Sequence, residues 1–152
     1  MNLYINNHTF HYEMENLVRA FFVYDKISVI KEYDTLETPY VLTSYTDEIC
    51  VKVSFDGVEK LLSAKKTEDP EKDELIMAQL MYKLMCEYFS TTLPWGVLTG
   101  VRPSKLLINT EKQMGREKTE EYFKKDLLVS DEKFNLANVS VFRKYAYSVF
   151  LT

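Results

Sequence analysis

One stretch of thirteen residues, 93–105, divides the chain into two kinds of sequence and limits what it can fold into. It reads Leu-Pro-Trp-Gly-Val-Leu-Thr-Gly-Val-Arg-Pro-Ser-Lys and holds the only Trp, two of the four Gly and two of the four Pro. Pro fixes φ and removes a donor, whereas Gly permits positive φ, so the stretch is a shaped connection. Strand and helix patterns precede it and only helical patterns follow. We therefore expect two domains, residues 1–93 and residues 94–152.

The first part has the pattern of a small α+β domain with the order β-α-β-β-β-α. Short apolar or alternating runs predict strands over residues 3–5, 27–33, 40–45 and 48–55. Apolar residues at three- and four-residue spacings predict helices over residues 9–24 and 71–91. Residues 58–64 are interpreted as a short apolar connector. Both helices should pack on one face of the sheet and close a two-layer sandwich.

The longer helix carries a row of three methionines, Met77, Met81 and Met85. Such a row can form an adaptable binding surface, because Met is flexible and polarizable. At helical spacing it is more often part of the core, and we favour that interpretation.

The second part predicts an all-helical subdomain of about three helices, over residues 104–114, 117–125 and 131–149. Ser130 precedes two acidic residues, which is the pattern of an N-cap followed by acids at the positive end of the helix dipole. Apolar positions recur along the last helix at Phe134, Leu136, Ala137, Val141, Tyr145 and Val149.

Net charge is distributed unevenly between the two parts. Residues 1–93 hold nine basic and sixteen acidic side chains, while residues 94–152 hold ten and seven. The overall charge of −4 argues against a dedicated nucleic-acid binder. The mildly basic second part suits an acidic partner or an anionic ligand, although two ordinary solvated surfaces give the same split.

The remaining composition points to a cytoplasmic protein. We see no signal peptide, and no apolar run approaches the roughly 20 residues of a membrane span. Cys50 and Cys86 are interpreted as unpaired small hydrophobic residues in a reducing compartment. Eleven Tyr and nine Phe suggest either a partly buried surface that a partner covers or a Tyr-rich edge of the core.

A candidate anion site lies at Thr99, Gly100, Arg102 and Lys105. Arg102 and Lys105 fall at a predicted helix start, where free backbone N–H groups favour an anion and two cations oppose the helix dipole. A carboxylate or phosphate bound between them is one explanation. An ion pair between Arg102 and an acidic residue of the first domain is the other, and we favour it. Trp95 is expected to be buried at the junction of the domains.

No catalytic constellation is evident elsewhere in the sequence. His8 and His11 are the only histidines and lie three residues apart at a predicted helix start. Such a pair can bind a metal, but a polar pair at the helix start is the simpler interpretation. We therefore assign no catalytic residue and no metal ligand.

The connecting stretch also carries a family resemblance. Residues 93–106, which extend it by one Leu, resemble the segment that precedes the catalytic barrel in HemZ-type, oxygen-independent coproporphyrinogen III oxidases, also called coproporphyrinogen dehydrogenases. Residues 128–133, Leu-Val-Ser-Asp-Glu-Lys, resemble a second marker of these proteins. Residues 4–22 are similar in pattern.

The resemblance implies a parent enzyme of haem (porphyrin) biosynthesis that uses S-adenosylmethionine and a [4Fe–4S] cluster held by a Cys-x3-Cys-x2-Cys motif. This chain has no such motif. We therefore expect a non-catalytic N-terminal accessory region, without cofactors of its own, that docks on the catalytic barrel of the same parent chain. Porphyrinogen is a further candidate partner.

A self-contained interaction module, or one that binds a small anionic ligand, is the alternative. The accessory region predicts that the reading frame continues beyond Thr152 into the three-Cys motif. The self-contained module predicts a helical tail with no exposed apolar face.

Overall fold

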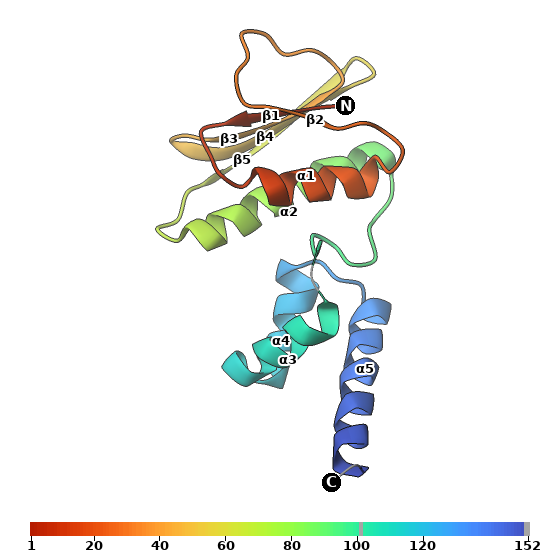
Figure 1. The fold of residues 1–152 in the computed structure, drawn as a ribbon. Helices are drawn as coiled ribbons and strands as arrows, with labels where there is room; N and C mark the ends of the chain where they lie inside the picture. Colours follow the sequence, from red (N-terminus) through yellow and green to blue (C-terminus); the bar gives the residue numbers. More distant parts are fainter. Residues whose placement is uncertain (101, 151–152) are drawn as a thin grey trace. The chain divides into compact units, whose positions relative to one another are not determined.

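The structure, a computed structural model, describes residues 1–100 and 102–150, with side chains described as far as residue 143. The chain forms two compact units, Met1–Thr91 and Thr92–Thr152. The first unit contains β1 (Asn2–Asn6), α1 (His11–Phe21), β2 (Ser28–Ile30), β3 (Tyr40–Tyr45), β4 (Glu48–Phe55), β5 (Val58–Lys65) and α2 (Pro70–Phe89). The second contains α3 (Pro103–Met114), α4 (Arg116–Glu121), a π-helical turn η1 (Tyr122–Asp126) and α5 (Asp131–Phe150). The expected α+β class is confirmed (Figure 1).

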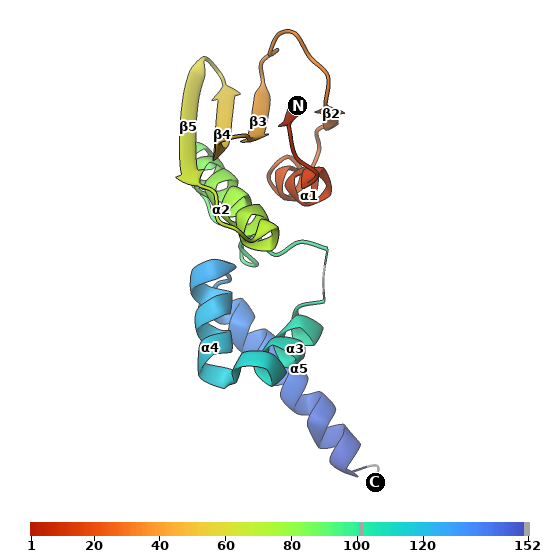
Figure 2. The same ribbon diagram turned by 90° about the vertical axis from the view of Figure 1, so that its left-hand side faces the viewer.

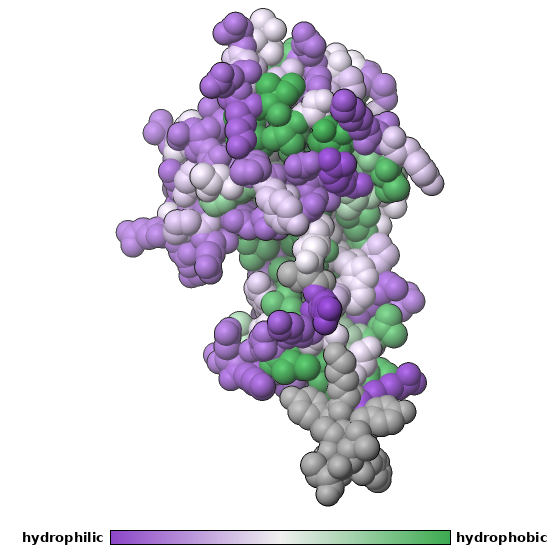
Figure 3. Space-filling view, viewed as in Figure 1, coloured by the Kyte–Doolittle hydropathy of each residue, from purple (hydrophilic) through white to green (hydrophobic). Residues whose placement is uncertain are grey.

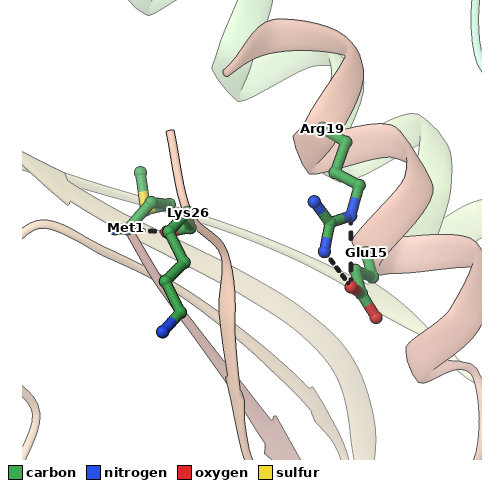
Figure 4. A network of polar contacts seen from close by, with 4 residues as sticks. All are labelled: Met1, Glu15, Arg19 and Lys26. Carbon is green, nitrogen blue, oxygen red and sulfur yellow. Dashed lines mark hydrogen bonds and ion pairs between the residues drawn. The ribbon is translucent and has the colours of Figure 1, made fainter. Parts of the chain in front are cut away.

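The first unit, all of which the structure describes, is built on a sheet with the order β2-β1-β3-β4-β5. Strand β1 runs parallel to both β2 and β3, whereas β3, β4 and β5 form antiparallel pairs. Helix α1 connects β1 to β2, as a parallel pair requires a crossover. The amino group of Met1 donates to the carbonyl of Lys26 and joins the N-terminus to the segment before β2 (Figure 4).

Both helices of this unit cover the same face of the sheet, as expected (Figures 1 and 2). On α1, Arg19 and Glu15 form an ion pair on the exposed side (Figure 4). The three methionines of α2 are fully buried, which confirms their place in the core. The buried apolar side chains of these helices and the sheet include Leu3, Met14, Leu17, Val18, Val41, Ile49, Val51, Val53, Met77, Met81, Leu84 and Met85.

The predicted connector at residues 58–64 is wrong, because this segment is the edge strand β5. Asp56 and Gly57 have φ of 49° and 78° and form the two-residue turn of a hairpin with β4. Residues that face the helices include Lys60, whereas Leu61 is on the opposite face and 55% exposed. Lys60 and Leu61 interrupt the apolar alternation of a half-buried strand, although the Asp-Gly pair is a hairpin signal.

Other elements differ from prediction mainly in their ends. Strand β2 has three residues instead of seven, and α1 ends at Phe21 instead of residue 24. The helix predicted over residues 117–125 is divided into α4 and η1.

A hydrogen-bonded chain fixes the start of α1. The backbone N–H of Phe10 donates to His8 Nδ1 at 3.0 Å, and His8 Nε2 lies 2.7 Å from the hydroxyl of Thr43. That hydroxyl donates to the carbonyl of Tyr4, so His8 is neutral and carries its proton on Nε2. Burial lowers the pKa of His8 to about 4, against a partial opposing effect of the bond to Thr43.

A second polar cluster joins α2 to the sheet at the buried carboxylate of Asp73. The hydroxyl of Tyr45 donates to Asp73 Oδ2 at 2.6 Å, and the N–H of Thr67 donates to Oδ1 at 2.8 Å. Burial alone raises the pKa of Asp73, but these hydrogen bonds outweigh it and leave the pKa below its ordinary value.

The helical unit has a core of its own. Its buried apolar side chains, among those described, are Leu107, Phe123, Leu127, Val129, Phe134, Ala137 and Val141. The N–H of Lys133 donates to the hydroxyl of Ser130, which confirms the predicted N-cap of α5. Tyr145 and Val149, two further apolar positions predicted for this helix, lie outside the described side chains. No helix in the described residues has the length and apolar character needed to cross a membrane.

Candidate functional site

The segment before α3 is a tight turn at Pro94–Val97. The N–H of Gly96 donates to the carbonyl of Leu93, and the N–H of Leu98 donates to that of Trp95. Gly96 has φ of 58°, and a Cβ at this position would lie 2.0 Å from the carbonyl oxygen of Leu127. Only Gly fits here, because both the backbone conformation and the close approach exclude a side chain.

Two backbone hydrogen bonds join this turn to the segment that precedes α5. Val97 N–H donates to the carbonyl of Leu127 at 3.0 Å, and Ser130 N–H donates to the carbonyl of Pro94 at 2.9 Å. The two segments that carry the family resemblance therefore lie side by side, although about thirty residues separate them in the sequence. Residues 94–97 are a fixed part of the helical unit.

Trp95 is half-buried within the helical unit. Its ring lines a pocket of about 150 Å³ together with Pro103 and Ser104 of α3 and Leu136, Ala137 and Ser140 of α5. The ammonium of Lys133 lies 5.8 Å from the ring centroid, at the outer limit of a cation–π contact. The role expected for Trp95 between the two units stays a prediction.

Helix α3 begins without an acidic residue or a side-chain cap. Arg102 is the N-cap residue with extended backbone, and Pro103 occupies the first helical position. Arg102 and Lys105 line a larger pocket of about 370 Å³, together with Leu106 and Asn109. Arg102, Lys105 and Asn109 are exposed, and Leu106 is half-buried. The pocket thus combines two cations, an amide and an apolar wall.

Within the helical unit, the charges of Arg102 and Lys105 are available to bind an anion. Among its described side chains, no carboxylate forms an ion pair with Arg102 or Lys105. Arg can hold a carboxylate or phosphate through two parallel hydrogen bonds, and the free N–H groups of a helix start add to the attraction. The ion pair expected between Arg102 and the first unit stays a prediction.

The remaining predicted site residues lie in the loop before α3. Thr99 is half-buried, and Gly100 is exposed with φ of 68°. Neither is among the described residues that line the pocket. Val101, part of the same motif, lies outside the described residues.

Leu106 and Asn109 were not predicted for the site. They follow Arg102 by four and seven residues, so they share its side of the helix. Helical spacing from Arg102 was therefore the signal that could have found them.

A second surface feature is an apolar stripe on α5, formed by Leu136, Val139 and Phe142. These side chains are 52%, 49% and 76% exposed. They recur every three residues and lie along one side of the helix, while Phe134, Ala137 and Val141 form the buried side. Leu136, one of the apolar positions predicted for this helix, is thus on the exposed side.

The donor set of the chain does not fit the [4Fe–4S] cluster that the resemblance implies for its parent. The motif requires three thiolates, and the sequence contains two Cys. Cys50 and Cys86 lie on β4 and α2, and no group of metal-binding side chains gathers in the described part of the chain.

The fold and site together define a class of protein: an α+β chain whose helical unit presents a basic pocket and an apolar stripe. A search of curated proteins finds similarity to the oxygen-independent coproporphyrinogen-III oxidase-like protein HemZ of Bacillus subtilis (strain 168). The two are 39% identical over 64 residues, which is 41% of this chain and 13% of HemZ. The chain therefore contains a HemZ-like region. No family model and no solved structure matches the chain.

Proposed function

We propose that this chain is the N-terminal accessory region of a HemZ-like coproporphyrinogen oxidase of the radical S-adenosylmethionine class, with a role in haem biosynthesis. In this proposal the chain contributes no catalytic residue and docks on the catalytic part of the protein through the apolar stripe of α5. The partial similarity to HemZ supports a role related to haem biosynthesis, since HemZ is described as coproporphyrinogen-III oxidase-like.

The exposed stripe is the observation that carries the docking role. Leu136, Val139 and Phe142 lie on one side of a helix whose other side is already packed. Monomeric soluble proteins rarely expose large contiguous apolar surfaces unless these serve an interaction. Figure 3 also shows hydrophobic residues at the surface of the helical unit, among hydrophilic ones. A self-contained module would bury such a stripe.

The proposal predicts that the stripe is needed for coproporphyrinogen conversion in cells. The genomic copy is replaced by a Leu136→Lys/Phe142→Lys variant, and coproporphyrin is quantified by chromatography after growth without oxygen. We expect coproporphyrin to accumulate as it does when the whole gene is deleted. Tyr24→Lys is the control, because Tyr24 is fully exposed in the first unit. The proposal is contradicted if the deletion strain and the stripe-variant strain both contain the same amount of coproporphyrin as the wild type.

A second candidate function, binding of a carboxylate-bearing ligand, is favoured by the pocket of Arg102, Lys105, Leu106 and Asn109. A porphyrinogen has an apolar macrocycle edged by propionates, which matches an apolar wall beside two cations. Titration with coproporphyrin III, followed by its fluorescence, tests this function.

We expect the Arg102→Ala/Lys105→Ala variant to bind coproporphyrin III at least about tenfold more weakly, because charge-assisted bonds are the strong ones. Lys118→Ala, an exposed lysine of α4, is the control of equal charge type. If the wild type and the double variant bind coproporphyrin III with equal affinity, this pocket is not the binding site.

A further inference from the structure

The free edge of β5 is a regular pairing surface. Its eight residues pair with β4 without a bulge, from Phe55 opposite Val58 to Glu48 opposite Lys65. It contains no Pro. The other edge of the sheet, β2, has only three residues. A long, straight edge strand exposes a row of unpaired N–H and C=O groups that can accept another strand.

The hairpin turn decides which backbone groups of β5 are unpaired. A two-residue turn is closed by a hydrogen-bonded pair, here Phe55 and Val58, and such pairs alternate along an antiparallel ladder. Residues 58, 60, 62 and 64 therefore direct their backbone groups toward β4. Residues 59, 61, 63 and 65 direct theirs outward, and their side chains are exposed as well.

These outward groups allow a self-complementary antiparallel register with its twofold axis at Leu62. In this register Glu59 lies opposite Lys65 of a second copy, Leu61 opposite Ser63, and the same pairs repeat across the axis. All four outward residues then exchange hydrogen bonds. Shifting the register by two residues in either direction loses paired positions and separates Glu59 from Lys65.

Charge and apolar contacts favour the same register. Glu59 and Lys65 occupy the same sheet face, and opposite charges directly across a pair of strands are stabilising. Lys65 forms no ion pair among the described residues, so its charge is available. Glu59 already pairs with Lys52 of β4 at 2.8 Å, so Lys65 of the second copy would join this carboxylate as a second cation. The two copies of Leu61, each 55% exposed, become diagonal neighbours on the open face.

We propose that β5 pairs with β5 of a second copy of this chain, joining two sheets into one continuous sheet. The inference is independent of the proposed function. It identifies an isologous interface, in which the same residues of both copies contact one another.

Sedimentation velocity of the full chain tests the proposal, from micromolar to near-millimolar concentration. We expect a concentration-dependent species of twice the 17.9 kDa monomer mass. Ser63→Pro removes an outward N–H that the monomer leaves unused, and should abolish the dimer, while Ser63→Thr keeps the donor and the dimer.

Charge reversal gives a second test that does not alter the backbone. Lys65→Glu places two acidic residues opposite each other and should weaken dimerisation about tenfold. Adding Glu59→Lys together with Lys52→Glu exchanges the charges, keeps the ion pair that residue 59 forms with β4, and should restore dimerisation. Circular dichroism checks that each variant is folded. A monomer at every concentration, or a dimer that Ser63→Pro and Lys65→Glu leave unchanged, overturns the proposal.

Discussion

At the scale of single residues, Gly96 determines how the helical unit is assembled. Its positive φ turns the chain before α3, and its missing side chain allows the carbonyl of Leu127 to approach. The hydrogen bond from Val97 to that carbonyl depends on the same approach. One residue thus joins the two segments that carry the family resemblance.

We predict that Gly96→Ala destabilises the helical unit by at least about 3 kcal/mol, because steric overlap adds to backbone strain. Urea unfolding followed by Trp95 fluorescence reports on this unit, as Trp95 is the only Trp. Gly57→Ala is the control, since Gly57 has positive φ but no atom within 4 Å of the place that a Cβ would take. It should cost about 1–2 kcal/mol in the first unit and leave the Trp95 transition unchanged. Similar shifts of that transition in both variants would refute the steric argument.

His8 makes the stability of the first unit depend on pH. The folded state holds His8 neutral, because protonation would put a proton on Nδ1, where Phe10 N–H already donates. Its pKa of about 4 lies below the ordinary 6.5, so the unfolded chain binds a proton first as pH falls. The stabilising contribution is complete above pH 6.5 and is lost progressively down to about pH 4.

We therefore predict that the urea midpoint of the first unit, followed by circular dichroism, decreases between pH 6.5 and 4. His8→Gln should show a smaller decrease over this interval, because it removes the titrating group. His11→Gln keeps His8 and should retain most of the decrease. Parallel pH profiles for the wild type and His8→Gln would contradict this assignment.

At the scale of elements, periodicity predicted the helices and the paired strands but not the edge. Strands β3 and β4 match their predicted ranges, and the helix-facing residues of β4, Ile49, Val51, Val53 and Phe55, are all apolar and buried. Strand β5 is half-buried on the face toward the helices and exposed on the other, and Lys60 and Leu61 have the opposite polarity to that expected of these faces. The Asp-Gly turn signal was the better evidence there.

The candidate site was predictable only in part, for a similar reason. Charge at a helix start identified Arg102 and Lys105, which line one pocket in the structure. The stripe on α5 could not be assigned, because Leu136 and Phe134 are both apolar and two apolar sides of one helix look alike in sequence. Only packing distinguishes the side that is buried.

Helix α2 provides a prediction at this scale. Met81 is completely buried beneath the sheet, so Met81→Ala should cost about 2–5 kcal/mol by leaving a cavity. Met81→Leu preserves volume and should cost less than about 1.5 kcal/mol. Urea unfolding followed by circular dichroism measures both. Equal, small effects would mean that the methionine row does not fill the core.

At the scale of the whole molecule, the chain consists of two units with separate cores and different surface character. The sheet-bearing unit is acidic, with a regular free edge at β5. The helical unit is basic, with a pocket at the start of α3 and an apolar stripe on α5. These surfaces are the basis of the proposed binding role, in which the proposed partner is the catalytic part of a HemZ-like protein.

Direct binding tests the docking role most sharply. Bacillus subtilis HemZ, with its matching 64-residue segment removed, is immobilised, and binding of the full chain is measured by interferometry. We predict saturable binding that the Leu136→Lys/Phe142→Lys variant weakens at least about tenfold, while Tyr24→Lys binds as the wild type does. Absence of binding by the wild type, or equal binding by the stripe variant, would contradict docking through α5.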